Sequence, residues 1–535
     1  MRLIQTAIDP LSPVYRTYER HNRQLATELH ERQRTARHER PQRDVDRLRK
    51  QGKLLVHERI ELLLDKGTPF LELSTLAANR SYDGNVPSAG LVSGIGIVNG
   101  REVLIMASDS SIKGGAWFPL TVKKMVRTTD IAIENHLPMV HLVDAAGAFL
   151  PLQSDLFADR HMAGRLFRNQ CILSAKGIKQ VALVLGHSTA GGAYVPTLCD
   201  YSVMVRGAGG VFLGGPPLVK AATGEDVSAD ELGGADVHST ISGTSDYAVD
   251  NEQEGIALVR EIVGTFPRPQ KAIVEHREPE EPYYDARELY GIIPDDVKKQ
   301  FDMLEVVARI VDGSRFHEFK PHYGTTVICG FAYLYGWKVG IIGNKGVLFS
   351  DSANKSTQFM QLCNRDRVPV IFLQNITGFM VGKEYEHGGI TKNGAKMLMV
   401  QSNLDVPKLT LMTNGSFGAG NYAMCGRAFD ARFLFAWPNS QISVMGMEQA
   451  AKTLSQLRVK TLERQGKSLS DEEIEKIYQG IKKDYMEKSS AYHSTSELWD
   501  DGIIDPIDTR KALGIALSAS LNRDFKETPH GILRI

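Results

Sequence analysis

The sequence predicts an α/β protein with two related halves, and three observations support this fold class. From about residue 88 onward, short apolar runs alternate with helical segments, which is typical of layered α/β structure. With 535 residues, the chain is longer than one ordinary hydrophobic core spans. A glycine-rich stretch at residues 186–196 returns, altered, at residues 414–422. We therefore expect two domains related by internal duplication.

An N-terminal helical arm is expected over residues 1–66. Residues 14–66 are rich in Arg, Glu and His and carry leucines at helical intervals, with breaks near Pro41 and Gly52. A solvated helical face is a simpler interpretation of these charges than a contact with nucleic acid.

The first domain is expected over residues 67–275. Its short apolar runs predict strands at Ser93–Val98, Val103–Ala107, Val140–Val143, Val181–Leu185 and Ser202–Val205. Between them, helical spacing predicts helices at Leu120–Asn135 and Gly164–Ala175.

The second domain is expected over residues 276–535, after a proline-rich linker at residues 266–288. Strands are predicted at Val327–Phe331, Lys338–Ile342, Val370–Gln374, Lys408–Met412 and Ile442–Val444. Helices are predicted at Ser356–Arg365, Lys392–Ser402, Asp471–Glu487 and Lys511–Leu521. Ser470 followed by Glu473 predicts a capping box at the start of the third helix.

The two halves keep nearly constant register. Spacings of 231, 228 and 232 residues separate three matched pairs: Gly147 and Gly378, Tyr194 and Tyr422, Gly214 and Gly446. The spacing between unrelated glycine-rich turns would vary over this length, so the nearly constant spacing supports duplication.

Composition excludes several classes of protein. Lys plus Arg and Asp plus Glu both number 63, which does not favour a nucleic-acid binder. The five cysteines form no C-x-x-C pair, and the histidines form no ligand pattern, so we expect no metal. No apolar run approaches the roughly 20 residues of a membrane helix, so we expect no membrane partner.

The repeated glycine-rich turns are the strongest functional candidates. Each follows a buried strand, where backbone N–H groups can stabilise developing negative charge. We expect Gly191 and Gly192 to hold one oxyanion, and Ala419 and Gly420 to hold a second. The alternative is that both are tight packing turns. A serine hydrolase is disfavoured because the G-x-S-x-G spacing fails at Ser188.

Further candidate ligand residues lie on neighbouring loops at strand ends, where α/β proteins place binding loops. They are Lys113, Gly114, Gly115, Ala146, Gly147, Ala148, Gly378, Phe379 and Tyr422. The sequence contains neither a dinucleotide fingerprint nor a G-x-x-x-x-G-K-[ST] phosphate loop, so NAD and ATP chemistry are unsupported.

Longer motifs resemble a known family. Residues 212–225 and 231–238 closely resemble the carboxyltransferase β subunits of biotin-dependent acyl-CoA carboxylases. Residues 372–382 and 418–422 look like the 3-methylcrotonyl-CoA carboxylase branch, to which geranyl-CoA carboxylase is closely related. The similarity extends from about residue 20 to the C-terminus.

This resemblance implies two tandem crotonase-like domains of the ClpP/crotonase superfamily, and a homohexamer at the centre of an α6β6 complex. Gly191 and Gly192 match the site for the thioester oxygen of acyl-CoA. Ala419 and Gly420 match the site for the ureido oxygen of carboxybiotin, which a biotinylated α subunit would deliver. The biotin enolate left after carboxyl release would then remove the substrate's acidic proton, so no protein base is required, and backbone dipoles and proximity would lower the barrier.

The resemblance makes 3-methylcrotonyl-CoA the expected substrate, in leucine breakdown. Geranyl-CoA, propionyl-CoA, a crotonase-type hydratase or isomerase and an inactive structural paralogue remain alternatives. Where the family usually reads D-S-G-G-A, this chain has Ala145 and Ala146 before Gly147, and the Ala146 methyl is expected to narrow the acyl pocket. With no targeting extension before the family-like region, we expect a bacterial cytoplasmic protein rather than a mitochondrial one.

Overall fold

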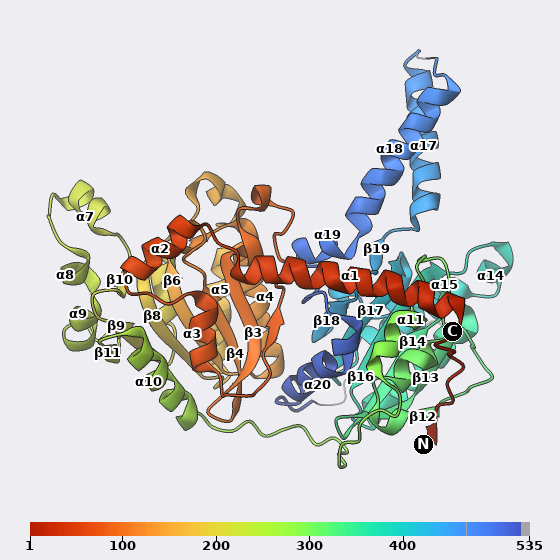
Figure 1. Cartoon of the computed structure of the whole chain (residues 1–535), viewed down its shortest axis with the longest axis horizontal. Helices are drawn as coiled ribbons and strands as arrows, with labels where there is room; N and C mark the ends of the chain where they lie inside the picture. Colours follow the sequence, from red (N-terminus) through yellow and green to blue (C-terminus); the bar gives the residue numbers. More distant parts are fainter. Residues whose placement is uncertain (467, 526–535) are drawn as a thin grey trace.

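The computed structural model describes residues 1–466 and 468–525, and two large sheets lie in separate halves of the chain (Figure 1). The last ten residues of the expected second domain, 526–535, lie outside this description. The first sheet has the order β11-β9-β8-β6-β4-β3-β2, with β10 paired to β8. Its strands are β2 (Leu71–Leu73), β3 (Leu91–Val98), β4 (Arg101–Ser108), β6 (Met139–Ala145), β8 (Gln180–Thr189), β9 (Tyr201–Val205), β10 (Gly210–Phe212) and β11 (Tyr247–Val249).

The second sheet has the order β1-β12-β13-β14-β16-β17-β18, with β15 paired to β16 and β19 to β17. Its strands are β1 (Arg2–Leu3), β12 (Arg315–Glu318), β13 (Val327–Leu334), β14 (Trp337–Asn344), β15 (Gly346–Leu348), β16 (Val370–Phe379), β17 (Lys408–Phe417), β18 (Phe433–Ala436) and β19 (Gln441–Ser443). Strand by strand, β12-β13-β14-β16-β17-β18 repeats the order β2-β3-β4-β6-β8-β9, and β19 joins β17 as β10 joins β8.

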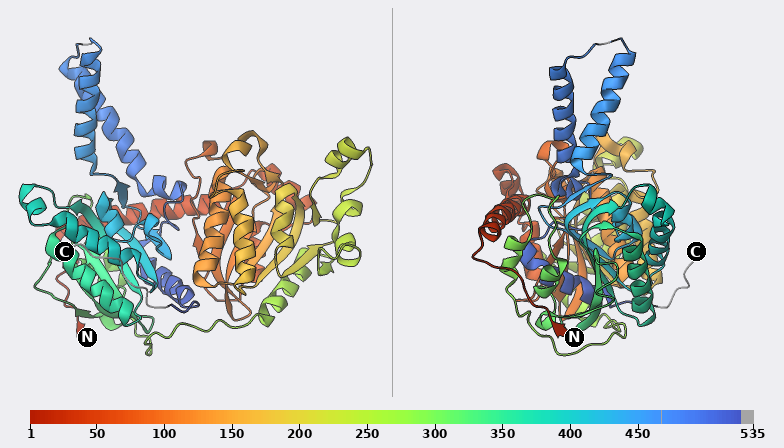
Figure 2. Two further views of the ribbon diagram at one scale, coloured as in Figure 1. Left: turned by 180° about the vertical axis from the view of Figure 1, so that it is seen from behind. Right: turned by 90° about the vertical axis from the view of Figure 1, so that its right-hand side faces the viewer.

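Both sheets begin with antiparallel pairs and continue with parallel strands. The parallel strands are buried along most of their length because helices cover the sheet faces (Figure 2). These helices are α3 (Val56–Leu63), α4 (Pro119–Asn135), α5 (Ala163–Ala175) and α10 (Glu252–Thr265) in the first half, and α13 (Ser350–Arg365), α15 (Ile390–Ser402) and α20 (Thr509–Ser520) in the second. The α/β prediction is confirmed.

A buried lysine occurs at matched positions in the two halves. Lys124 on α4 donates to the carbonyl of Leu91, the first residue of β3, at 2.6 Å. Lys355 on α13 donates to the carbonyl of Val327, the first residue of β13, at 2.8 Å. The two lysines lie 231 residues apart, and each is at most 1% exposed. Burial lowers the pKa of Lys124 to about 7.

The N-terminal segment forms three helices, α1 (Pro13–His38), α2 (Gln42–Lys50) and α3, with the predicted breaks at Pro41 and Gly52. The amide of Asn22 on α1 donates to two carbonyls of the second half, whereas Arg40 bonds to Asp109 of the first half. Helix α1 therefore spans both halves (Figure 1). Helix α3 contributes Val56, Ile60 and Leu63 to the core of the first half, while the expected boundary at residue 66 stays a prediction.

The two halves are joined by the proline-rich segment between α10 and α11 (Leu289–Ile292), which contains one β-bridge, His276 to Trp337. Helices α17 (Met447–Arg464) and α18 (Asp471–Ser489) form a hairpin that projects from the second half (Figures 1 and 2). The predicted capping box is confirmed. The Ser470 hydroxyl accepts a hydrogen bond from the backbone N–H of Glu473, and the Glu473 carboxylate accepts one from the backbone N–H of Ser470.

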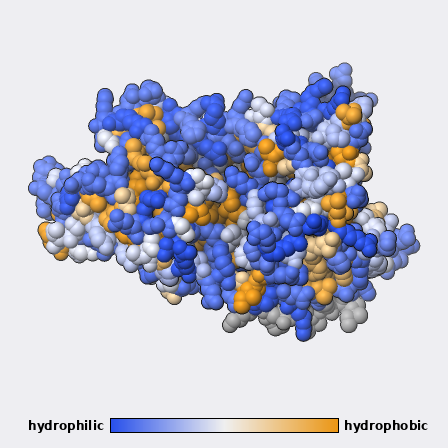
Figure 3. Space-filling view, turned by 60° about the horizontal axis from the view of Figure 1, so that its bottom comes forward, coloured by the Kyte–Doolittle hydropathy of each residue, from blue (hydrophilic) through white to orange (hydrophobic). Residues whose placement is uncertain are grey.

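Six further short helices lie outside these sets. They are α7 (Pro216–Thr223), α8 (Ala229–Gly233), α9 (Ala235–Thr240), α12 (Met303–Ala308), α14 (Lys383–His387) and α19 (Ala491–Ser496). One face of the molecule is mostly hydrophilic, with separate hydrophobic patches (Figure 3). Among the helices of residues 1–466 and 468–525, none combines the length and apolar character required to cross a bilayer.

Candidate functional site

Three predicted loops of the first half come together at the ends of β6 and β8. The short strands β5 (Ala116–Trp117) and β7 (Gly147–Ala148) pair in parallel, so Lys113, Gly114 and Gly115 immediately precede a strand that contacts Gly147. The Thr189 hydroxyl donates to the Ala146 carbonyl at 3.1 Å, which joins the third loop. All eight residues predicted in this half thus belong to one region of the surface.

Gly115 is required by the backbone. Its φ is +76°, and a Cβ atom would lie 2.3 Å from the Asp144 carbonyl oxygen. Only glycine allows this close approach between the two loops.

The turn with Gly191 and Gly192 differs from that case. Strand β8 continues to Thr189 because β10 pairs with residues 187–189, so the glycine-rich turn starts later than expected. It forms a 3-10 turn, Ala190–Ala193, followed by α6 (Tyr194–Thr197). A Cβ atom would make only ordinary contacts, 3.5 Å from the Phe167 ring at Gly191 and 3.5 Å from the Ser188 hydroxyl at Gly192.

Neither conformation nor internal packing therefore demands glycine at 191 or 192. Both have ordinary negative φ. The first N–H groups of a helical turn lack intrahelical partners. Bare backbone at this position leaves room for a ligand oxygen to approach those groups.

The predicted residues of the second half form another group. Gly378 lies near the end of β16, and Ala419 and Gly420 begin α16 (Ala419–Ala423). A Cβ atom on Gly420 would lie 3.3 Å from the Gly378 Cα and 2.3 Å from Ile376 Cγ1. Glycine at 420 is therefore explained by packing against β16, which agrees with the packing alternative for that residue.

Exposure in this second group is uneven. Ala419 is exposed, and the Tyr422 side chain is 49% exposed beside Phe429. The Phe379 ring lies 3.1 Å from the Cβ position of Gly394 and so packs on α15. The two groups belong to different sheets, and the structure of one chain does not bring them into a shared hydrogen-bonded network.

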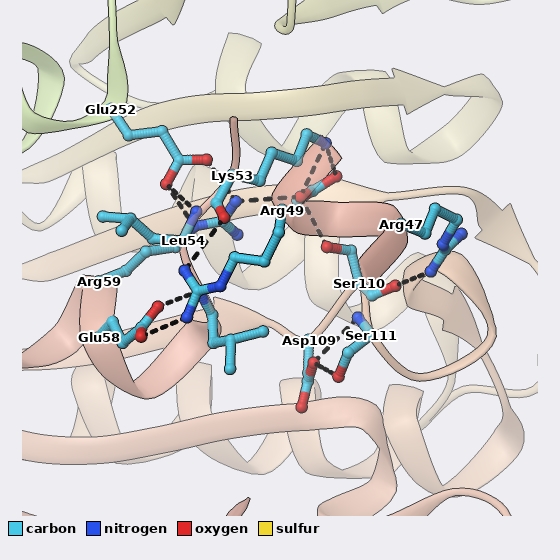
Figure 4. A network of polar contacts seen from close by, with 12 residues as sticks. Arg47, Arg49, Lys53, Leu54, Glu58, Arg59, Asp109, Ser110, Ser111 and Glu252 are labelled. Carbon is cyan, nitrogen blue, oxygen red and sulfur yellow. Dashed lines mark hydrogen bonds and ion pairs between the residues drawn. The ribbon is translucent and has the colours of Figure 1, made fainter. Parts of the chain in front are cut away.

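A buried ionic network beneath the loop at 146–148 was not anticipated from the sequence (Figure 4). Asp144 accepts from Lys53 at 3.0 Å, from the Ser110 hydroxyl at 2.7 Å and from Arg59 at 3.3 Å. Arg59 also bonds Glu252 at 2.6 Å and 2.9 Å. A carboxylate near the end of β6, Asp144, was the only sign of this network in the sequence. Its partners Arg59 and Lys53 lie 85 and 91 residues away along the chain, so the pairing could not be predicted.

This network makes Asp144 structural rather than catalytic. Its side chain is 5% exposed, and a Cβ atom on Gly186 would lie 1.9 Å from one of its carboxylate oxygens. Burial lowers the pKa of Arg59, but the Glu252 and Asp144 carboxylates outweigh this and raise it. Asp144 is thus not available as the base that a hydratase would need.

Metal ligands are not apparent in the described part of the chain, and the Cys329 thiol is buried. No group of three or more His, Cys, Asp or Glu side chains suits a metal ion there. Burial raises the pKa of the Cys329 thiol to about 12, which keeps it protonated.

Comparison with known proteins assigns the family. A family model described as the carboxyl transferase domain matches residues 47–531. The chain belongs to the carboxyl transferase family.

Three of these similarities are informative. A methylcrotonoyl-CoA carboxylase beta chain of Dictyostelium discoideum is 52% identical over 481 residues, covering 90% of this chain and 82% of that protein. A 3-methylcrotonyl-coenzyme A carboxylase beta1 subunit of Mycobacterium tuberculosis is 51% identical, with 90% and 92% covered. The crystal structure of the P. aeruginosa geranyl-CoA carboxylase beta subunit superposes with a TM-score of 0.88 at 40% identity, with 99% of both chains covered.

The expectation of a bacterial cytoplasmic protein is wrong on these comparisons. Three eukaryotic relatives at 50% to 52% identity are named as mitochondrial beta chains. The expectation relied on where the chain begins, and the start of a sequence does not establish the compartment of its folded domains.

Proposed function

We propose that this chain is the carboxyltransferase subunit of a biotin-dependent acyl-CoA carboxylase and that it carboxylates 3-methylcrotonyl-CoA. The observation that carries the proposal is the 51% to 52% identity, over 90% of the chain, to beta subunits named for that substrate. Membership of the carboxyl transferase family supports the reaction class.

The acyl-CoA site is proposed at the first group of loops. Gly191 and Gly192 would donate N–H groups to the thioester oxygen as it takes on enolate charge. The backbone supports this role, because neither conformation nor packing within the chain requires glycine at either position; Gly191 is partly exposed and Gly192 is buried. Lys113, Gly114, Gly115, Ala146, Gly147 and Ala148 would line the same substrate.

The carboxyl donor is proposed to bind at the second group of loops. Carboxybiotin on a partner subunit supplies the carboxyl group when it is bound. Ala419 and Gly420 would hold its ureido oxygen, and Gly378, Phe379 and Tyr422 would surround it. The exposed start of α16 fits this task, since first-turn N–H groups can face a ligand there.

Backbone dipoles would therefore perform the catalytic work. Preorganised N–H donors stabilise the developing oxyanion, and proximity lowers the entropic cost of bringing the two substrates together. The burial and pairing of Asp144 support a mechanism without a protein carboxylate as the base.

The two halves are proposed to be tandem crotonase-like domains, 67–275 and 276–535, that arose by duplication. The repeated strand order supports this history. So does the matched pair Lys124 and Lys355, whose ammonium groups reach the first carbonyl of equivalent strands.

The assembly is proposed to be a homohexamer that binds six biotinylated α subunits. In such an assembly, the first half of one subunit would face the second half of its neighbour, which would unite the two groups of loops. This proposal depends on family membership, and native mass measurement of the purified complex tests it.

Geranyl-CoA is the second candidate substrate. The full-length superposition on the geranyl-CoA carboxylase beta subunit favours it. The lower identity, 40% against 51% to 52%, places it behind 3-methylcrotonyl-CoA.

The substrate is tested by purifying the chain with a biotinylated partner and measuring ATP-dependent fixation of radiolabelled bicarbonate. We expect kcat/KM to be highest for 3-methylcrotonyl-CoA among that compound, geranyl-CoA and propionyl-CoA. Highest kcat/KM with geranyl-CoA would transfer the assignment to the second candidate. Lack of fixation with every acyl-CoA would contradict the reaction class.

A further inference from the structure

The turn that carries Gly191 and Gly192 is held by a buried serine on the preceding strand. Ser188 has 0% exposed side chain, and its hydroxyl donates to the Gly192 carbonyl at 2.7 Å. Because glycine has a wide choice of backbone conformations, this bond restricts a rotation through which the turn could otherwise relax.

The helix after this turn has a second buried contact. Gln170 on α5 is 0% exposed, and its amide donates to the Val195 carbonyl in α6 at 2.9 Å. Gln180 on β8 in turn donates to the Gln170 backbone carbonyl at 3.0 Å. The turn and its helix are thus attached at two points to the core of the first half.

The second half holds α16 by a related arrangement. The Ser416 hydroxyl donates to the Gln374 side-chain oxygen at 2.5 Å and accepts from the Asn421 amide at 2.8 Å. The Gln374 amide donates to the Met424 carbonyl, directly after the helix, at 2.8 Å. Ser416 and Gln374 both have 0% exposed side chains.

The two serines occupy matched positions. Ser188 lies three residues before Gly191, and Ser416 lies three residues before Ala419. Their separation of 228 residues equals that of Tyr194 and Tyr422. The match agrees with the proposed duplication, as that of Lys124 and Lys355 does, and it places a buried hydroxyl at the same step before both turns.

We propose that Ser188 and Ser416 are positioning residues for the two oxyanion turns. Ser188 acts directly on the Gly192 carbonyl, whereas Ser416 acts through Asn421 and Gln374. This inference deepens the proposed function and depends on it. Oxyanion donors act because they are already aimed before reaction, so a loosened turn should lose transition-state stabilisation while substrate binding changes little.

The test compares Ser188→Ala and Ser416→Ala in the complex with its biotinylated partner. Loss of a whole oxyanion donor costs about 100-fold to 1,000-fold in kcat, so we expect a loosened donor to cost about tenfold to 100-fold. The KM for acyl-CoA should stay within about twofold, because ground-state contacts remain. Ser188→Cys, which retains a weak donor of similar shape, should recover part of kcat.

Ser520→Ala is the matched control. Ser520 on α20 is also 0% exposed, and its hydroxyl donates to the Ala516 carbonyl at 2.7 Å, the same distance as in the Ser188 bond. The control should lower Tm as much as Ser188→Ala while kcat is retained. If the wild-type complex is active and both Ser188→Ala and Ser416→Ala have the same kcat as Ser520→Ala, the inference is overturned while the proposed function stands. Absence of carboxylation by the wild-type complex would overturn the proposed function and this inference together.

Discussion

At the scale of single residues, glycine serves different purposes in the two turns. Gly420 avoids overlap with Ile376, and Gly115 avoids the Asp144 carbonyl. At Gly191 and Gly192 an added Cβ atom would make only ordinary contacts, so packing does not require glycine there, and we attribute it to the proposed contact with the thioester oxygen. Gly420 therefore has a packing role beside its proposed contact with the ureido oxygen, whereas packing does not account for the equivalent Gly192.

Gly191→Ala tests this distinction. The added methyl group has room within the chain, so Tm should stay close to that of the wild type. The methyl group would sit beside the proposed thioester site and the Phe167 ring, and kcat/KM should fall by about tenfold to 100-fold, short of the loss of a complete donor. Gly164→Ala on α5, where nothing lies within 4 Å of the new atom, should leave both quantities unchanged or slightly raise Tm. Equal activity of the two variants would remove the ligand explanation.

Asp500 provides a test based on pH. Burial, and to a smaller extent the charge of Asp501, raises its pKa from 3.8 to about 6, with Arg427 acting in the opposite direction. A raised acid pKa gives stability that is present below pH 3.8 and is lost as pH rises through about 6. The difference in Tm between wild type and Asp500→Asn should therefore fall between about pH 4 and about pH 7, by an amount equivalent to at most about 3 kcal/mol. A difference independent of pH would show that Asp500 does not titrate in this range.

At the scale of elements, the sequence predicted the parallel strands and their covering helices well. Long apolar runs such as Val181–Leu185 bounded by glycine allowed this. Pairing between distant segments was not visible in advance. Strand β8 continues four residues beyond the predicted end, through Gly186–Thr189, and β10 pairs with the last three of them. The short buried strand β18 was not predicted.

For the candidate site too, local patterns could be predicted from the sequence and contacts between distant segments could not. Glycine-rich loops at strand ends could be recognised from composition and position. The bonds that hold them could not, because Gln170 meets Val195 and Gln374 meets Met424 only after the sheet has formed. The network of Asp144 with Lys53 and Arg59 likewise joins residues far apart in the chain.

Packing of α16 on β16 can be tested with Gly420→Ala. Overlap with Ile376 Cγ1 should displace the helix and lower stability by about 1 to 3 kcal/mol, measured by chemical denaturation. The double variant Gly420→Ala/Ile376→Ala should be less destabilised than the sum of the two single changes, since the overlap is relieved. Simple additivity would contradict this close approach.

At the scale of the whole molecule, the two halves are joined by a buried ion cluster around Asp501. This residue, 1% exposed, accepts from Arg127 on α4 of the first half at 2.9 Å and from Arg427 of the second half at 2.8 Å. Burial raises the pKa of Asp501, but the two arginines outweigh burial and hold it well below its ordinary value. The cluster therefore links the two halves of the subunit.

Asp501→Asn should therefore destabilise the chain by about 3 kcal/mol, because the partly buried Arg127 and Arg427 lose the buried carboxylate between them, although Arg127 keeps its pair with Glu134. Thermal unfolding of the purified chain measures the effect. Asp226→Asn, which breaks an exposed pair with Lys220, should leave Tm nearly unchanged. Similar effects of the two substitutions would show that the cluster does not stabilise the contact between halves.

A structure of the complex with an unreactive analogue of 3-methylcrotonyl-CoA tests the central claim most directly, since it locates the thioester oxygen. We predict this oxygen within about 3 Å of the backbone nitrogens of Gly191 and Gly192, with a partner subunit's second half facing it. An analogue bound with its thioester oxygen away from this turn, or held by a side-chain acid, would contradict the account.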